Sequence, residues 1–171
     1  SDLKLIALDT EDLDVVSATT QDAIVRVGDM AFARGARRFA LMMNRFAWEH
    51  ADGRARGQPG VRKRAALHFL RMGVQHVAIS IGSLGVLLAS QNVILQATPP
   101  KMATHNVTGA GAAVMAGLAY GFSHNMPLNE IARWAAAYGA VVISTERLSS
   151  TTLEELHQML PRVEVRTVNV M

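Results

Sequence analysis

The chain contains no cysteine, and only 5% of its 171 residues are aromatic. The missing cysteine excludes disulfides, thiolate metal sites and cysteine nucleophiles, and it fits a reducing compartment. No apolar run reaches the ~18 residues that a membrane span needs. The first residues are acidic and lack a basic segment, so they do not predict a signal peptide. We therefore expect a soluble, cytoplasmic protein with no membrane partner.

Charge is scarce in the second part of the chain. Residues 1–74 hold 12 Lys/Arg and 9 Asp/Glu, whereas residues 75–171 hold 5 of each. Half of the residues are hydrophobic, enough to build a core in a chain of this length. The composition shift predicts two segments of different origin, 1–73 and 74–171, which could still share one core.

The local patterns predict a mixed α/β (α+β) fold. In the first segment they indicate a strand over 3–8, a helix over 11–21, a hairpin turning at 34–37 into a strand over 38–49, and a loop over 51–60. Residues 61–72 fit a strand nearly as well as a helix. The second segment reads strand, glycine turn and strand over 77–90, and a strand over 93–98. Helices over 108–123, 128–144 and 151–159 and a last strand over 163–170 follow.

The stretch HNVTGAGAAVMAGLA at 105–119 places two glycines where an apolar helix begins. Amide groups at a helix start have no intrahelical acceptor and, with the helix dipole, attract anions. Gly109 and Gly111 would let the backbone approach a phosphate without a Cβ in the way. Close helix packing is the commoner reason for such glycines, so the motif alone leaves both interpretations open.

Residues 74–171 resemble the C-terminal nucleotide-binding part of ribokinase-like (PfkB-type) sugar kinases, pseudouridine kinases in particular. The matching features are Asn106, the Thr108–Gly111 turn, the run Ala116-Gly-Leu-Ala119 and the run Ser80-Ile-Gly-Ser-Leu-Gly85. The resemblance implies a partial ribokinase-like sheet with packed helices, one of which, around 135–140, walls the adenine pocket. It also implies nucleotide-binding positions, namely Ser80, Gly82, Gly85, Asn106, Thr108, Gly109, Ala110 and Gly111.

Two departures from that family weaken the expectation of catalysis. The aspartate that follows Gly111 in the family is the catalytic base, and this chain has Ala112 there. The N-terminal half that the family uses for the sugar and the metal is missing, and no Asn-x-x-Glu motif occurs. The sequence therefore predicts no catalytic residue, no metal site and no required cofactor, with weak binding of ATP as the remaining possibility.

Residues 2–72 are similar to the start of a small uncharacterised bacterial protein family, through features such as LKLIALD, VGDMAF and NRFAWE. That resemblance implies a small α+β segment and no chemistry. Two joined domain fragments are unusual in nature. The leading hypothesis is therefore an engineered chimera without catalysis, with residual nucleotide or phosphate affinity at 108–111.

Two rival hypotheses come from other classes. The chain could be an ATP-dependent sugar or nucleoside kinase completed by another chain, or by Asp9, Asp22 or Asp29 acting as the base. It could instead bind nucleic acid weakly through the basic 54–64 loop, although solvated loop charge is the commoner reason for such residues. Trp134 and Tyr138, four residues apart, predict a packing pair.

The last expectation concerns assembly. Apolar surface in 77–98 and 112–143 needs cover, because large exposed apolar patches are rare in soluble monomers. We expect a homodimer, plausibly with exchanged elements. Its strand pairing would use the edge strand 93–98 or 163–170.

Overall fold

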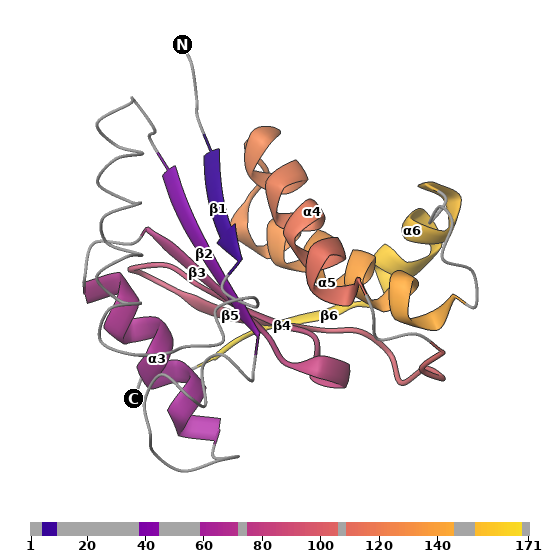
Figure 1. The fold of residues 1–171 in the computed structure, drawn as a ribbon, viewed down its shortest axis with the longest axis horizontal. Coiled ribbons are helices and arrows are strands. Elements are labelled where there is room, and N and C mark those ends of the chain that lie inside the picture. The colour runs from indigo at the N-terminus through magenta and orange to yellow at the C-terminus, as the bar shows by residue number, and fades with distance from the viewer. Residues whose placement is uncertain are drawn as a thin grey trace.

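The computed structural model describes residues 5–9, 38–44, 59–71, 75–105, 109–145 and 153–168. Its centre is one six-stranded sheet whose strands follow one another in chain order (Figure 1). The first three strands are parallel, and every later neighbour is antiparallel. A mixed α/β fold is thereby confirmed. The strands are β1 (Leu5–Asp9), β2 (Arg38–Asn44), β3 (His76–Ser80), β4 (Val86–Ala89), β5 (Ile94–Thr98) and β6 (Glu164–Thr167).

Helices cover both faces of this sheet. Figure 1 shows α3 (Pro59–Arg71) on one side and the pair α4 (Ala110–Ser123) and α5 (Leu128–Ser144) on the other. The short helix α6 (Leu153–Met159) lies against α5 and leads through the 3₁₀ turn Leu160–Arg162 into β6. A second 3₁₀ turn, Gly82–Leu84, connects β3 to β4.

Strand periodicity divides the buried side chains between the two faces. Ala78, Leu88 and Leu95 are cross-strand neighbours, and all three belong to the core cluster formed with α4 and α5. Val77 and Ile79 alternate with Ala78 and therefore face the α3 side, where they are also buried. A sheet buried on both faces explains why the strand residues 77–79 and 86–89 are all apolar.

The α4–α5 pair packs unusually closely because glycine occurs where the helices meet. A Cβ built on Gly117 would lie 2.7 Å from Cα of Ala135, and one on Gly121 would lie 2.9 Å from Cγ1 of Ile131. The buried side chains of Leu118 and Phe122 stand beside these glycines on α4. The glycines in the second half of α4 are thus explained by helix packing.

In the first segment the structure corrects two sequence expectations and decides one ambiguity. The expected loop 51–60 ends early, because α3 begins at Pro59, and proline suits a first helical position. Residues 61–71 are helical, which decides the ambiguity in favour of the helix. Both edges of β2 are occupied by parallel neighbours, so β2 is no hairpin strand. The expected helix 11–21, the hairpin turn 34–37 and residues 45–49 lie outside the described residues.

The second segment follows its expected elements closely. The helix expected over 128–144 has those bounds, and α4 begins at the expected glycine turn. Of the last strand expected over 163–170, the structure assigns Glu164–Thr167, and residues 169 and 170 lie outside the described residues. Within the described part of the chain, no helix is both long and apolar enough to cross a membrane.

Candidate functional site

Four strands end at one edge of the sheet. β1, β2 and β3 are parallel, and β5 runs the same way because two antiparallel pairings separate it from β3. Their last residues are Asp9, Asn44, Ser80 and Thr98, all polar. In open α/β sheets, ligands bind outside the carboxyl ends of the strands. This edge is therefore the place to look for a site.

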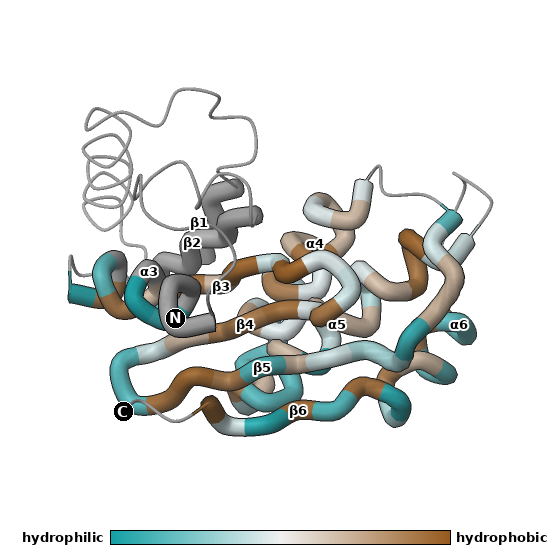
Figure 2. The backbone as a smooth tube through the Cα atoms, turned by 90° about the horizontal axis from the view of Figure 1, so that it is seen from below, coloured by the Kyte–Doolittle hydropathy of each residue, from teal (hydrophilic) through white to brown (hydrophobic). Residues whose placement is uncertain are grey.

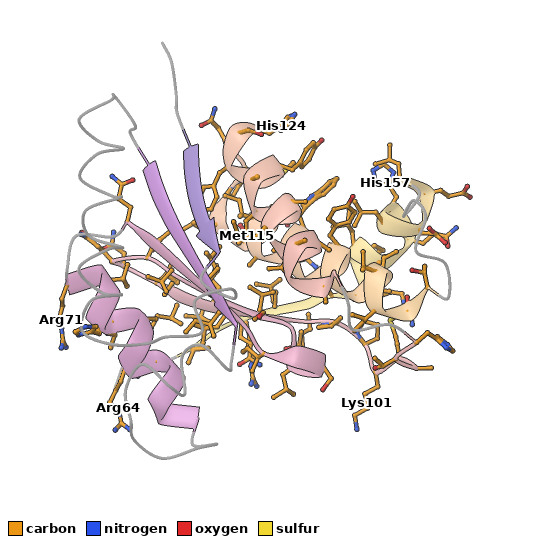
Figure 3. The ribbon with its side chains drawn as sticks, viewed as in Figure 1. Arg64, Arg71, Lys101, Met115, His124 and His157 are labelled. Carbon is orange, nitrogen blue, oxygen red and sulfur yellow. The ribbon has the colours of Figure 1, made fainter. Side chains whose placement is uncertain are left out.

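Helix α4 directs its N-terminus toward the same edge. Near its other end, the ring of Phe122 lies 4.7 Å from that of His76, the first residue of β3. From Phe122 back to Gly109 the helix rises about 20 Å, whereas β3 spans only about 13 Å from His76 to Ser80. Figure 3 labels His124 at the far end of α4, beside the start of β1. The first turn of α4 consequently lies at the carboxyl edge.

The first turn of α4 is open and carries no acidic side chain. Gly109 precedes the helix in the left-handed conformation, with φ 88°, and no side chain caps the helix there. The first helical hydrogen bond runs from the Ala113 amide to the Gly109 carbonyl at 2.9 Å, so the amides of residues 110–112 precede it. Gly109 is exposed, and its nearest neighbour for an added Cβ is Val142, at 3.9 Å. Such a turn is suited to an anion.

The C-terminal end of α5 supports this turn. The His105 amide donates to the Ile143 carbonyl at 2.8 Å, which holds the segment before α4 against the last turn of α5. The hydroxyls of Ser144 and Thr145 donate back to carbonyls of their own helix, at 3.0 and 3.1 Å. The end of α5 thus closes one side of the turn with apolar side chains and occupied hydroxyls.

The turn between β3 and β4 lies at the same edge and contains two glycines in different situations. A Cβ on Gly85 would lie 1.9 Å from the Ala97 carbonyl oxygen and 2.8 Å from Pro99, so no side chain fits. Gly82 has φ 58° and no atom within 4 Å of an added Cβ. The Ile81 amide donates to the Gly85 carbonyl at 2.7 Å and closes the turn. Gly85 therefore packs the turn against β5, whereas Gly82 faces open space.

Six of the eight residues expected to bind nucleotide lie at this edge. Ser80, Gly82 and Gly85 come from the β3–β4 turn, and Gly109, Ala110 and Gly111 come from the start of α4. Asn106 and Thr108 lie outside the described residues. Their nucleotide-binding role stays a prediction.

Ala112 is exposed in the first turn of α4. Its methyl group can neither accept nor donate a proton. The described part of this turn can therefore position and neutralise an anion, whereas proton transfer needs a group from elsewhere. Asp9 is the acidic residue at which β1 ends, on the same sheet edge. No group of three or more potential metal ligands occurs among the described residues.

The structure adds to one sequence expectation and corrects another. Trp134 stacks on Tyr120 of the neighbouring helix, with ring centroids 4.7 Å apart. Packing of Trp134 on Tyr138, four residues along the same helix, stays a prediction. Within the expected basic loop 54–64, residues 59–64 are helical, and Figure 3 shows Arg64 pointing away from the sheet. Contacts between helices, such as Tyr120 with Trp134, leave no signal in local spacing.

The fold resembles part of the ribokinase-like fold. It superposes on Escherichia coli phosphofructokinase-2 with a TM-score of 0.75 and 16% identity, over 92% of this chain and 56% of that one. A nucleoside kinase of Methanocaldococcus jannaschii, an archaeal member of the ribokinase family, gives 0.67 and 16%, over 92% and 48%. At these identities the likeness concerns the fold alone.

Sequence comparison finds two kinds of relatives. Residues 3–93 match the family described as "Protein of unknown function (DUF2948)". This is more than half of the chain, so the chain belongs to that family. The chain is also 34% identical to Bacillus subtilis 1-phosphofructokinase over 56% of its length and 31% of the relative. The corresponding values for the Escherichia coli enzyme are 31%, 61% and 34%.

These matches overturn the expectation of a non-catalytic protein, because the relatives at 28–34% identity are enzymes. The chain spans only about a third of the length of these curated relatives. The family match continues to residue 93, past the expected boundary near residue 73. One sheet also crosses that boundary, since β2 pairs with β3. The sequence relatives described above are 1-phosphofructokinases, so the closer likeness to pseudouridine kinases stays a prediction.

Proposed function

We propose that the chain is the ATP-binding part of an ATP-dependent sugar kinase whose acceptor-binding part lies on another chain. The main support for this proposal is the first turn of α4, which lies at the carboxyl edge of the sheet. That turn is open, has no side-chain cap and carries no acidic side chain. Sequence likeness to 1-phosphofructokinases supports the same reaction class. A sugar phosphate is the favoured acceptor, and a nucleoside such as pseudouridine is the second candidate.

In this proposal the α4 turn holds the phosphates of ATP and Gly82 leaves room beside them. Phosphoryl transfer depends mostly on positioning and charge neutralisation, which backbone amides and bound Mg²⁺ can supply. The acceptor hydroxyl loses its proton as its oxygen attacks the γ-phosphorus and ADP leaves. Because Ala112 cannot take that proton, the base is a carboxylate of the partner chain or one from the N-terminal segment. Asp9 is the candidate at the same edge, and Asp22 and Asp29 lie outside the described residues.

The proposal also includes a cytoplasmic location and a homo-oligomeric state. Related phosphofructokinase-2 of Escherichia coli has a tetrameric inhibited form. Exchange of elements between copies remains part of this proposal.

Calorimetric titration of ATP with Mg²⁺ tests the site. Gly109→Ala forces an alanine into the left-handed conformation at the proposed phosphate position, and we expect it to weaken ATP binding at least tenfold. Asn125→Ala is the matched control, because Asn125 also has positive φ, 52°, but lies just beyond the other end of α4. Each change costs roughly 1 kcal/mol of stability through the left-handed backbone. Equal ATP affinity in both variants would contradict the phosphate site.

A coupled assay for ADP release tests the reaction. Fructose 1-phosphate, fructose 6-phosphate and pseudouridine are the acceptors to compare. We expect turnover with a sugar phosphate when a second chain that binds the acceptor is present. ATP binding without turnover for any acceptor would retain the site and reject the kinase.

A further inference from the structure

Strand β6 has a neighbour on only one side within the described sheet. It ends the strand order, and Glu164, Arg166 and Thr167 are exposed. Figure 2 shows a mostly hydrophilic tube along β6, in contrast to the hydrophobic β4 inside the sheet. An open edge presents backbone groups to which another strand can bind.

The hydrogen-bond pattern determines which residues of β6 offer those groups. The Val168 amide donates to the Ile94 carbonyl of β5 at 2.7 Å. In an antiparallel pair the hydrogen-bonded residues alternate, so 164, 166 and 168 direct their backbone groups toward β5. Val165 and Thr167 therefore direct theirs outward.

Side-chain charge then restricts how a second β6 can pair with the first. When two identical strands pair antiparallel about a two-fold axis, the same face of each strand lies on the same side of the joined sheet. The axis must then pass through a residue that stands opposite its own copy. Glu164 and Arg166 share one face of β6. A pairing centred on Glu164 opposes two carboxylates, and one centred on Arg166 opposes two guanidinium groups, both destabilising. Centred on Val165, each Glu164 stands opposite Arg166 of the other copy.

We propose that β6 pairs with β6 of a second copy, antiparallel and centred on Val165, and joins two sheets into one. Val165 of each copy donates its amide to, and accepts at its carbonyl from, Val165 of the other. The two Glu164–Arg166 pairs occupy positions without backbone bonds, where facing side chains come closest. Val165 already packs against the core, so the central contact extends that core.

The pairing is short because Val163 is already engaged. Its amide donates to the Leu160 carbonyl at 3.3 Å, and its carbonyl accepts from Arg133 Nη1 at 2.6 Å. In the register centred on Val165, Thr167 would face Val163, so pairing is confined to residues 164–166. The two ion pairs determine its register. Salt screens such pairs, so the dimer should weaken as ionic strength rises.

Charge exchange tests both the interface and its register. Sedimentation of the unaltered chain at high micromolar concentration should give twice the chain mass of 18.5 kDa. Glu164→Arg alone places Arg opposite Arg166, and Arg166→Glu alone places Glu opposite Glu164, so each variant should be monomeric. An equimolar mixture restores both ion pairs and should give a heterodimer. The double variant should form a homodimer again.

Arg162→Glu is the control, since Arg162 is exposed directly before the strand and should leave the dimer intact. Circular dichroism of each variant shows that the fold is retained. A monomeric unaltered chain, a dimeric single variant, or a mixture that stays monomeric would each overturn the proposal. ATP affinity should be unchanged in all these variants, so failure here is distinct from failure of the kinase proposal.

Discussion

The glycines of this chain differ in what surrounds them. Some allow close packing of neighbouring elements, and others leave space for a ligand. Gly117 in the middle of α4 and Gly85 before β4 lie so close to neighbouring backbone that a Cβ would overlap it. Gly109 and Gly82 have positive φ and open surroundings. The first pair holds helices and strands together, whereas the second pair leaves space at the carboxyl edge. Only the second pair is suited to an incoming ligand.

Gly85→Ala should have the largest effect on stability. The Cβ would overlap the Ala97 carbonyl, and the backbone at φ 89° and ψ −129° is nearly exclusive to glycine. We expect a loss of about 4 kcal/mol or more, an exceptional value for one methyl group. Urea unfolding measures it. Gly82→Ala is the control, with a loss of roughly 1 kcal/mol from positive φ alone.

If Gly85→Ala and Gly82→Ala cost the same, the close approach of Gly85 to β5 would be wrong. The distinction between a packed Gly85 and an open Gly82 would then not hold for this turn.

Gly117→Ala should lower the free energy of unfolding less than Gly85→Ala does, because α4 and α5 can separate slightly. The added Cβ meets the Ala135 backbone at 2.7 Å, and overpacking of this kind costs about 1–3 kcal/mol. Alanine is intrinsically better than glycine in a helix by about 1 kcal/mol, so the net loss is smaller than the clash. Thermal unfolding should still show a lower midpoint. The neighbouring Ala116→Gly measures the propensity effect at an exposed position of the same helix.

The sequence predicted those features of the fold that interactions between neighbouring residues determine. The bounds of α5 and the glycine turn before α4 follow from helix periodicity and conformational preference. Whether Gly85 or Gly82 is packed depends on β5, which is distant in sequence. The stacking of Tyr120 on Trp134 likewise depends on the crossing of two helices. Such contacts arise from tertiary structure, which local spacing does not encode.

The site was predictable in part for the same reason. The Gly109–Gly111 turn carries its own signal, since a left-handed residue before a helix favours glycine. That Ser80, Gly82 and the start of α4 share one edge follows only from the topology, in which β3 and β5 run the same way. The expectation of no catalysis gave more weight to the missing catalytic base at Ala112 than to the similarity of the remaining motif. The enzyme relatives contradict that expectation.

Arg133→Ala should have a moderate effect, and it tests the packed side of the molecule. Arg133 Nη1 donates to the Val163 carbonyl at 2.6 Å, and its Nε lies 3.3 Å from Glu130. A hydrogen bond from a charged group contributes about 1.5–3 kcal/mol, and loss of this one loosens the start of β6 from α5. Arg162→Ala, at an exposed position, should stay within about 0.5 kcal/mol. Denaturant unfolding compares the two variants.

Ala112→Asp should have the smallest effect on stability and the most informative effect on activity. A carboxylate in the first turn of α4 interacts favourably with the helix dipole, by about 0.3–1 kcal/mol. If the turn holds ATP and the acceptor is present, the same carboxylate supplies a base, typically worth 10²–10⁴ in rate. Ala112→Asn has nearly the same shape but cannot accept the proton, and Ala116→Asp adds the charge one turn further along the exposed side. A rate gain specific to Ala112→Asp would mark the open end of α4 as a reaction site, whereas equal rates in all three variants would show that this end only binds.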